Sequence, residues 1–286
     1  MRICLFWNES AGGGLSLDEL TSQITSAGHE VARVVERGDD LDAHVRDGFD
    51  CVAAAGGDGT IASAGRTLAG GDVPLAVLPL GTANNIATSL GIEGRTADLI
   101  ARWSLDRVAR IDVGVVSWSG RDRHFLESVG VGLVTDTIER ARHAVSKDYQ
   151  ATHLEDARRL YIEVLTRQQP SRHAIAIGDA GVSGDYLLIE ALNTPLIGPG
   201  INLTAGASAA DGLLSVVAVT DVDRDTLSRY LQSLREGATA DAGFHSWRAP
   251  DVTLHGASRV HIDDTIETVT GSVAISIAAG ALPILG

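Results

Sequence analysis

One glycine-rich segment with an acid at its centre points most directly to chemistry. It consists of Gly56-Gly57-Asp58-Gly59-Thr60 and follows the apolar run 50–55. Glycines let the backbone approach a phosphate closely, and a helix starting there presents N–H groups to it. An acid between them would repel phosphate oxygens unless it holds a metal ion or takes the proton of an attacking hydroxyl. The segment therefore predicts a phosphoryl-transfer site.

Glycines in this pattern also occur in two simpler structures. One is an ordinary strand-to-helix turn. The other is a dinucleotide-binding fingerprint, GxGxxA, which fits Gly57–Ala62, but no acid that could bind a ribose stands near Leu78-Pro79, about 20 residues on. The spacing GxxxxGK[ST] is absent, so the segment is not a P-loop.

A second polar loop follows the next predicted strand. It runs from Pro79 to Asn85 and contains Gly81, Thr82 and two asparagines. Loops at the carboxyl ends of neighbouring parallel strands emerge at the same sheet edge, where ligands bind. The two loops are therefore expected to converge.

The first hundred or so residues alternate short β-prone runs, glycine turns and helical segments, which predicts a parallel α/β domain. Expected strands are 2–7, 30–35, 50–55 and 73–78. Expected helices are one capped by Ser16 or Asp18 and ending at Gly28, then 41–46, one that follows Thr60 and runs to about 68, and one that follows Asn85 and runs through 90.

From about residue 111 the pattern changes to alternating runs, which predicts an antiparallel β domain. Expected strands are 111–118, 124–133, 174–177, 186–192, 213–219, 252–254 and 260–262, with helical segments 135–167 and 224–236. The domain boundary is placed near Arg110. The alternating segment 271–286 is also expected to be β-structure.

Composition excludes some partners. The chain of 286 residues has 32 glycines and a formal net charge of -14, without a Lys/Arg-rich run. Nucleic acid is therefore not an expected partner, and any membrane contact should be transient and apolar.

The cysteines and the first residues indicate the compartment. Cys4 and Cys51 lie in apolar runs and lack metal or redox spacing, which is typical of buried thiols in a reducing cytosol. The run 1–7 is too short for a signal peptide, and no stretch reaches about 18 apolar residues. The nine histidines show no ligand spacing. A cytoplasmic protein without zinc is expected.

GGDGT followed by PLGTANNIA resembles the diacylglycerol kinase catalytic family, which includes sphingosine kinases and bacterial lipid kinases and is related to NAD kinases. The family's second motif usually has the form PxGTxNDxA. Weaker matches follow the family's order over most of the chain: Asn8-Glu9-Ser10-Ala11-Gly12, Ile111-Asp112-Val113-Gly114, Gly130-Val131-Gly132, Asn193-Thr194-Pro195 and Asp211-Gly212-Leu213.

The resemblance implies an α/β plus β fold: an N-terminal parallel-sheet nucleotide-binding domain, 1–110, completed by 273–286, and a C-terminal antiparallel β-sandwich, 111–272, that binds the acceptor and carries helical insertions. ATP and Mg²⁺ are the implied cofactors. The residues implied to hold nucleotide or metal are Asn8, Gly57, Asp58, Gly59, Thr60, Gly81, Thr82 and Asn84. Asp112 is implied at the mouth of the cleft. Asp211 matches a turn that can hold a structural Mg²⁺, although a plain Asp-Gly hairpin explains it too.

The chain departs from the family pattern at two places. Ala62 and Ser63 replace an Asn-Glu pair after GGDGT, and Thr265 replaces the Glu that is often regarded as the general base. Asp264 or Glu267 could substitute, or Asp58 could itself be the base. Asp263 and Asp264 could equally be solvated turn acids.

Three functions are compatible with these residues. The first is an ATP-dependent kinase of diacylglycerol or a similar lipid in phospholipid metabolism. The second is a kinase of a small polar alcohol, as in NAD kinases, and the third is a regulatory protein with a decayed catalytic set. The loop 193–200 could touch a membrane or merely pack. A homodimer is compatible with the sequence.

Overall fold

The computed structural model describes residues 1–11, 15–45, 48–144, 154–178 and 180–285. The chain divides into two compact units. Unit 1 comprises Met1–Val113 and Ala279–Gly286, and unit 2 comprises Gly114–Ala278.

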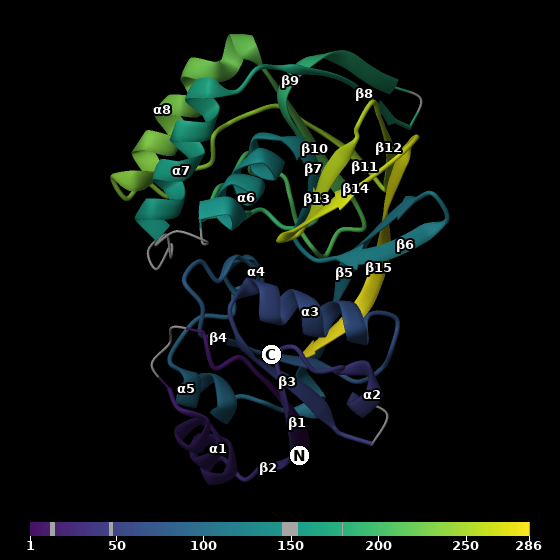
Figure 1. Cartoon of the computed structure of the whole chain (residues 1–286). Coiled ribbons are helices and arrows are strands. Elements are labelled where there is room, and N and C mark those ends of the chain that lie inside the picture. The colour runs from purple at the N-terminus through teal and green to yellow at the C-terminus, as the bar shows by residue number, and fades with distance from the viewer. Residues whose placement is uncertain (12–14, 46–47, 145–153, 179, 286) are drawn as a thin grey trace. The chain divides into compact units, whose positions relative to one another are not determined.

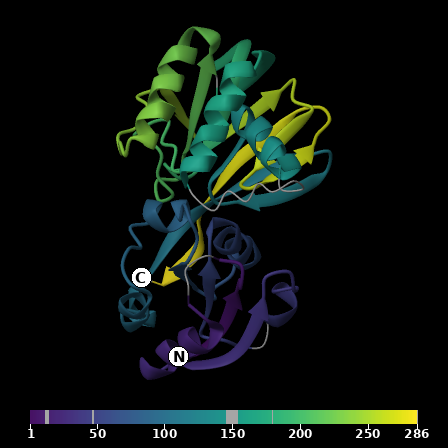
Figure 2. The ribbon, with the colours of Figure 1, turned by 60° about the vertical axis from the view of Figure 1, so that its left-hand side comes forward.

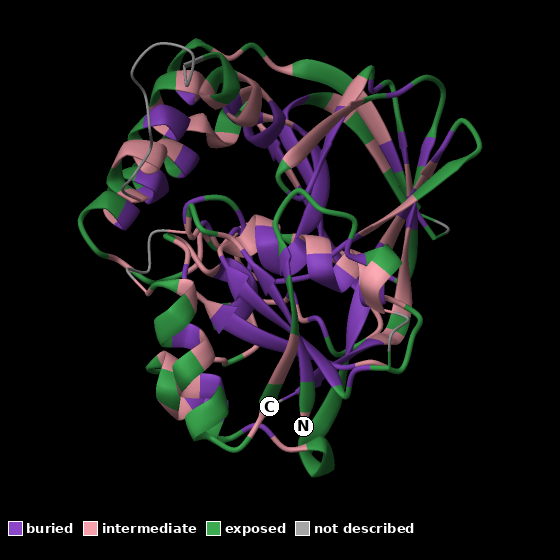
Figure 3. Ribbon diagram, turned by 60° about the horizontal axis from the view of Figure 1, so that its bottom comes forward, coloured by how far each residue is buried: buried purple, intermediate pink, exposed green. Residues whose placement is uncertain are grey.

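Unit 1 is built on a parallel sheet (Figure 1). Its strands are β1 (Arg2–Trp7), β2 (Glu30–Glu36), β3 (Cys51–Gly56) and β4 (Leu75–Pro79), with the end of β15 (Val273–Leu285) added in parallel beside β4. Every residue of β3 is buried (Figure 3). Burial on both faces explains why this segment is continuously apolar instead of alternating.

Helices and a 3₁₀ turn connect the strands of unit 1. They are α1 (Leu17–Ser26), α2 (Asp42–Val45), α3 (Asp58–Leu68), α4 (Asn85–Ser89), α5 (Thr96–Ala101) and η1 (Leu105–Arg107). Ser16 and Glu19 form a capping box at the start of α1, which confirms the expected cap. The short helix α5 was not expected. Arg46, the last residue of the expected helix 41–46, lies outside the described residues.

Unit 2 is an antiparallel β structure covered by helices (Figure 2). Strands β5 (Val108–Trp118) and β15 are shared between the two units, because unit 2 begins at Gly114 and ends at Ala278. The other strands of unit 2 are β6 (Arg121–Phe125), β7 (Ser128–Gly132), β8 (Ser171–Ile177), β9 (Ala180–Leu192), β10 (Leu214–Thr220), β11 (Ser246–Ala249), β12 (Asp251–His255), β13 (Arg259–Ile262) and β14 (Thr265–Thr268). Its helical elements are α6 (Leu133–Ala144), α7 (Leu154–Arg167), η2 (Asp221–Asp223) and α8 (Arg224–Arg235). The fold class is thus α/β plus β, as predicted.

Two apolar cores stabilise unit 2. One lies between strand faces and includes Phe125, Val216 and Ile262. The other lies between strands and helices and includes Leu188 and Leu231. Residues alternate between these environments along β10, where Val216 belongs to the first core and Val217 and Val219 to the second.

Two local expectations differ from the structure. The expected strand 124–133 is divided between two strands, β6 and β7, because Leu126 and Glu127 belong to neither. The helical segment 135–167 contains α6 and α7, and 145–153 lies outside the described residues. In the loop 193–200, for which membrane contact and packing were both left open, Ile197 is 2% exposed and packs into the second core, whereas Leu196 is partly exposed.

No helix within the described residues is long and apolar enough to cross a membrane.

Candidate functional site

The two glycine loops of unit 1 contact each other through their backbones. Gly56, at the end of β3, accepts a hydrogen bond from Leu80 N at 2.9 Å. A Cβ placed on Gly81 would lie 2.4 Å from the Cα of Gly57, which is closer than packed atoms come. Glycine is therefore required at position 81, and the expected convergence of the loops is confirmed.

The carboxylate of Asp58 joins the first loop to the second. Its Oδ1 accepts a hydrogen bond from Ile86 N, in α4, at 2.9 Å. Burial raises the pKa of this carboxyl above its ordinary value, and hydrogen bonds from the backbone N–H groups of Ile86, Asn85 and Asn84 act in the opposite direction. Asp58 is thus a partly desolvated acid with a fixed orientation.

Asn8 and Thr60 join the loop after β1 to the start of α3. Asn8 Nδ2 donates to Thr60 Oγ1 at 3.2 Å, and the Thr60 side chain is fully buried. This buried hydroxyl therefore accepts a hydrogen bond that joins two loops. Gly12, the last residue of the expected Asn8–Gly12 motif, lies outside the described residues.

Asn84 closes the second loop on itself. It has a φ of 52°, in the left-handed region that asparagine tolerates better than most residues. Its Oδ1 accepts from Gly81 N at 2.9 Å, and its Nδ2 donates to Gly81 O at 3.0 Å. Thr82 is the exposed residue within this closed loop.

The start of α3 has no side-chain cap, because its N-cap residue is Gly57. Helix α1, in contrast, is capped by a side chain, because the Ser16 hydroxyl accepts a hydrogen bond from Glu19 N. Uncapped N–H groups at a helix N-terminus, together with a glycine backbone, form a site that attracts phosphate.

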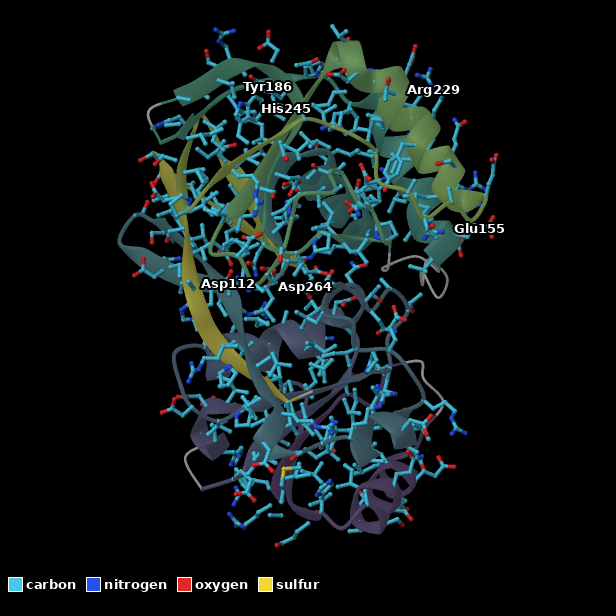
Figure 4. The ribbon with its side chains drawn as sticks, turned by 180° about the vertical axis from the view of Figure 1, so that it is seen from behind. Asp112, Glu155, Tyr186, Arg229, His245 and Asp264 are labelled. Atoms are coloured by element: carbon cyan, nitrogen blue, oxygen red, sulfur yellow. The ribbon has the colours of Figure 1, made fainter. Side chains whose placement is uncertain are left out.

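Asp112 lies on β5 and is only 4% exposed (Figure 4). Its Oδ1 accepts a hydrogen bond from Gly280 N, in β15, at 2.8 Å. This carboxylate therefore connects two strands within unit 1.

Asp211 stabilises a turn. Its Oδ1 accepts from Leu213 N at 3.0 Å, and its other oxygen pairs with the guanidinium of Arg248. An arginine at the carboxylate competes with a cation, so the geometry favours the plain turn over the structural Mg²⁺ site.

The turn between β13 and β14 separates two neighbouring acids. Asp263 is 5% exposed, and its carboxylate accepts hydrogen bonds from Glu127 N at 2.8 Å and from Leu126 N at 3.1 Å. Asp264 is exposed and is labelled in Figure 4. The interpretation of both as solvated turn acids is therefore wrong for Asp263.

Glu267, the other candidate base in this hairpin, forms an ion pair with Arg123 at 2.8 Å. Thr265, at the position of the family's Glu, donates its hydroxyl to Ile262 O at 2.9 Å.

Sequence reasoning missed a buried polar group in unit 2. Glu190 and His261 are both fully buried, with Glu190 Oε2 3.2 Å from His261 Nε2. His261 Nδ1 lies 3.1 Å from Thr135 Oγ1. These residues come from β9, β13 and α6, and no pattern of spacing along the sequence predicts that they meet.

Within the described residues, no group of three or more His, Cys, Asp or Glu side chains could hold a metal ion. Mg²⁺ at kinase sites is commonly held by one or two carboxylates and by substrate phosphates, so it does not require such a group. Asp58 is the one acid in the two loops, and its orientation beside the uncapped start of α3 fits a metal held mainly by phosphate oxygens.

The fold is an α/β domain, in which two glycine loops contact each other, followed by a β-sandwich. Two family models match the chain: the diacylglycerol kinase catalytic domain over residues 2–116, and the YegS C-terminal NAD kinase beta sandwich-like domain over residues 136–285. The chain therefore belongs to the diacylglycerol kinase and YegS-like family of lipid kinases, a family of phosphotransferases.

The names of relatives agree with this family. The chain is 27% identical to a diacylglycerol kinase of Mycobacterium tuberculosis over 92% of this chain and 85% of that protein. It is 30% identical to a probable lipid kinase YegS of Escherichia coli over 79% of this chain and 73% of that protein.

Solved structures show the same fold. A putative diacylglycerol kinase from Bacillus anthracis matches with a TM-score of 0.76 at 18% identity, over 99% of this chain and 94% of that chain. An NAD kinase from Archaeoglobus fulgidus, solved in complex with ATP, matches with a TM-score of 0.54 at 12% identity, over 100% of this chain and 94% of that chain.

Proposed function

We propose that this protein is an ATP-dependent lipid kinase that transfers the γ-phosphoryl group to a hydroxyl of diacylglycerol or a similar lipid. The backbone contact of Gly57 with Gly81, with Asp58 bonded across both loops, carries the proposal. The relatives named as diacylglycerol and lipid kinases support the acceptor class. The archaeal relative's complex supports ATP.

In this proposal, unit 1 binds the nucleotide and unit 2 binds the acceptor. The backbones of Gly57, Gly59 and Gly81 and the exposed Thr82 contact the phosphates. Asn8, Thr60 and Asn84 keep the loops in place through the hydrogen bonds described above.

Asp58 is proposed to hold the orientation of both loops and to bind Mg²⁺, which neutralises charge on the phosphate oxygens when it is bound. Asp112 is proposed to support the domain through β15, and Asp264 to accept the proton of the acceptor hydroxyl. For Asp211 the ion pair with Arg248 supports a structural role only.

A second candidate function is a nucleotide- or lipid-binding regulator without turnover. Two observations favour it. Ala62, which replaces a polar residue of the family, is 1% exposed on α3, and the hydroxyl of Thr265 is bonded to Ile262 O.

Phosphoryl transfer from γ-labelled ATP to a panel of diacylglycerols, other lipids and polar alcohols including NAD separates these functions. Labelled phosphatidic acid is the expected product. Asp58→Asn should lower kcat by about 10²-fold or more, because metal placement and orientation dominate phosphoryl transfer. Full activity of Asp58→Asn would show that the site is assigned wrongly, whereas ATP binding without turnover on any acceptor would support the regulator.

A further inference from the structure

The segment Leu126-Glu127, which joins β6 to β7, is held from two sides. On one side, the carboxylate of Asp263 accepts from Glu127 N at 2.8 Å and from Leu126 N at 3.1 Å. On the other side, Asn193 Nδ2 donates to Leu126 O at 2.8 Å, and Asn193 N donates to Glu127 O at 2.8 Å. All four backbone polar groups of the segment are thereby paired, although it belongs to no strand.

Asp263 has an unusual backbone conformation for a residue with a side chain. Its φ is 49°, in the left-handed region, and it is 5% exposed. Its own N–H donates to Ser128 O at 2.9 Å. Backbone strain of this kind persists where surrounding bonds over-determine the conformation, and it concentrates at functional sites. Here the carboxylate and the backbone N–H of one residue both bind the segment 126–128.

The next residue, Asp264, is the exposed acid of the same two-residue turn (Figure 4). Its carbonyl oxygen accepts a hydrogen bond from Arg142, in α6, at 3.1 Å. The direction of its side chain follows from the backbone of the turn. That backbone is fixed by Asp263 on one side of Asp264 and by the Ile262–Thr265 pairing on the other.

We propose that Asp263 is a positioning residue for phosphoryl transfer: it holds the β13–β14 turn against Leu126-Glu127 so that Asp264 presents its carboxylate to the acceptor. The inference rests on the proposed function. Asp264 takes the proton of the acceptor hydroxyl, whose oxygen forms a bond to the γ-phosphorus. The bond from this phosphorus to the β,γ-bridging oxygen breaks, and the electron pair leaves with ADP.

The test compares Asp263→Asn with Tyr230→Phe as a matched control. Asparagine keeps Oδ1, which accepts from both N–H groups, but replaces Oδ2, which lies 3.3 Å from Leu126 N, with an NH2 group that faces this N–H donor to donor. Tyr230→Phe also removes a side-chain acceptor of a backbone N–H in unit 2, that of Asn202 at 2.7 Å, but on α8. Asp263→Asn should lower kcat about 10-fold or more with KM for ATP within about twofold, whereas Tyr230→Phe should keep kcat.

Amide hydrogen exchange gives a second readout. In Asp263→Asn the N–H groups of Leu126 and Glu127 should exchange faster than in the wild type, and in Tyr230→Phe they should not. If the wild type phosphorylates no acceptor, the proposed function fails. Unchanged exchange at the amides of Leu126 and Glu127 in Asp263→Asn would independently show that the Asp263 carboxylate does not hold this segment.

Asp264→Ala keeps the proposal testable should Asp263→Asn not fold, because Asp264 is exposed. The expected loss in kcat is about 10²-fold, the lower end for a general base. An Asp264→Ala enzyme with wild-type kcat, or a folded Asp263→Asn enzyme within about twofold of wild type, overturns the positioning role.

Discussion

The Asp58 side chain is both hydrogen-bonded and buried. It is held by N–H groups at the start of α4, and it is desolvated by burial, which raises its pKa. An acid that is already desolvated and oriented can bind a metal ion or a proton with little rearrangement of water. The same desolvation makes the charged form costly to the fold.

The stability of the wild type relative to Asp58→Asn should therefore depend on pH. Since the folded carboxyl binds its proton more tightly than the unfolded one, its favourable contribution is complete below the ordinary pKa of 3.8 and is lost as pH rises through the folded pKa. Urea denaturation of both proteins from about pH 4 to about pH 7 should show the free-energy difference falling with pH. A flat or rising difference would contradict the raised pKa.

Gly81→Ala should disrupt the site without a change of charge. The added Cβ would lie 2.4 Å from the backbone of Gly57, which cannot move aside like a flexible side chain. A loss of about 1–3 kcal/mol in unfolding free energy is expected, together with weakened Mg-ATP binding measured by calorimetry.

Gly184→Ala on β9 is the control, because its Cβ would meet Tyr186 at an ordinary 3.4 Å. Equal effects of the two substitutions would argue against a specific contact between the loops.

At the scale of elements, side chains from β9, β13 and α6 meet inside unit 2. Thr135 Oγ1 donates to Gly130 O at 3.1 Å and also lies 3.1 Å from His261 Nδ1. His261 Nε2 faces Glu190 Oε2.

Removal of one partner of this pair should therefore cost more than removal of both. His261→Gln should lower the free energy of unfolding by about 3–5 kcal/mol, because it leaves a fully buried acid without its partner. In His261→Gln/Glu190→Gln the loss should be smaller, as measured by urea denaturation in a double-mutant cycle. Additive losses would show that the two residues are not coupled.

At the scale of the whole molecule, nucleotide binding should stabilise the folded chain. Mg-ATP at about 100 times its dissociation constant should add about 2.7 kcal/mol, because it binds the folded state only. A thermal melt with and without Mg-ATP measures this, with Gly81→Ala as the variant whose shift should shrink. No shift at any nucleotide concentration would contradict a nucleotide site.

Local patterns in the sequence predicted most elements and the class of fold. The strand Arg2–Trp7, the cap at Ser16 and the helix ending at Leu68 depend on neighbours within a few residues, so they were predictable. The convergence of the two loops was predictable too, because adjacent parallel strands end at one sheet edge.

Only the tertiary structure decided what the side chains of the site bind. Asp58 and Ile86 are 28 residues apart, and Asp263 and Glu127 are 136 apart. The segment Leu126-Glu127 between β6 and β7 is bonded by the side chains of Asp263, in the β13–β14 turn, and Asn193, just after β9. Both are remote in sequence, so the local alternation indicated one continuous strand. Sequence alone determined the family and the order of its motifs, because these are properties of neighbours along the chain. Hydrogen bonds between remote segments exist only after packing brings their atoms together, and packing settled which acids are buried and which is exposed.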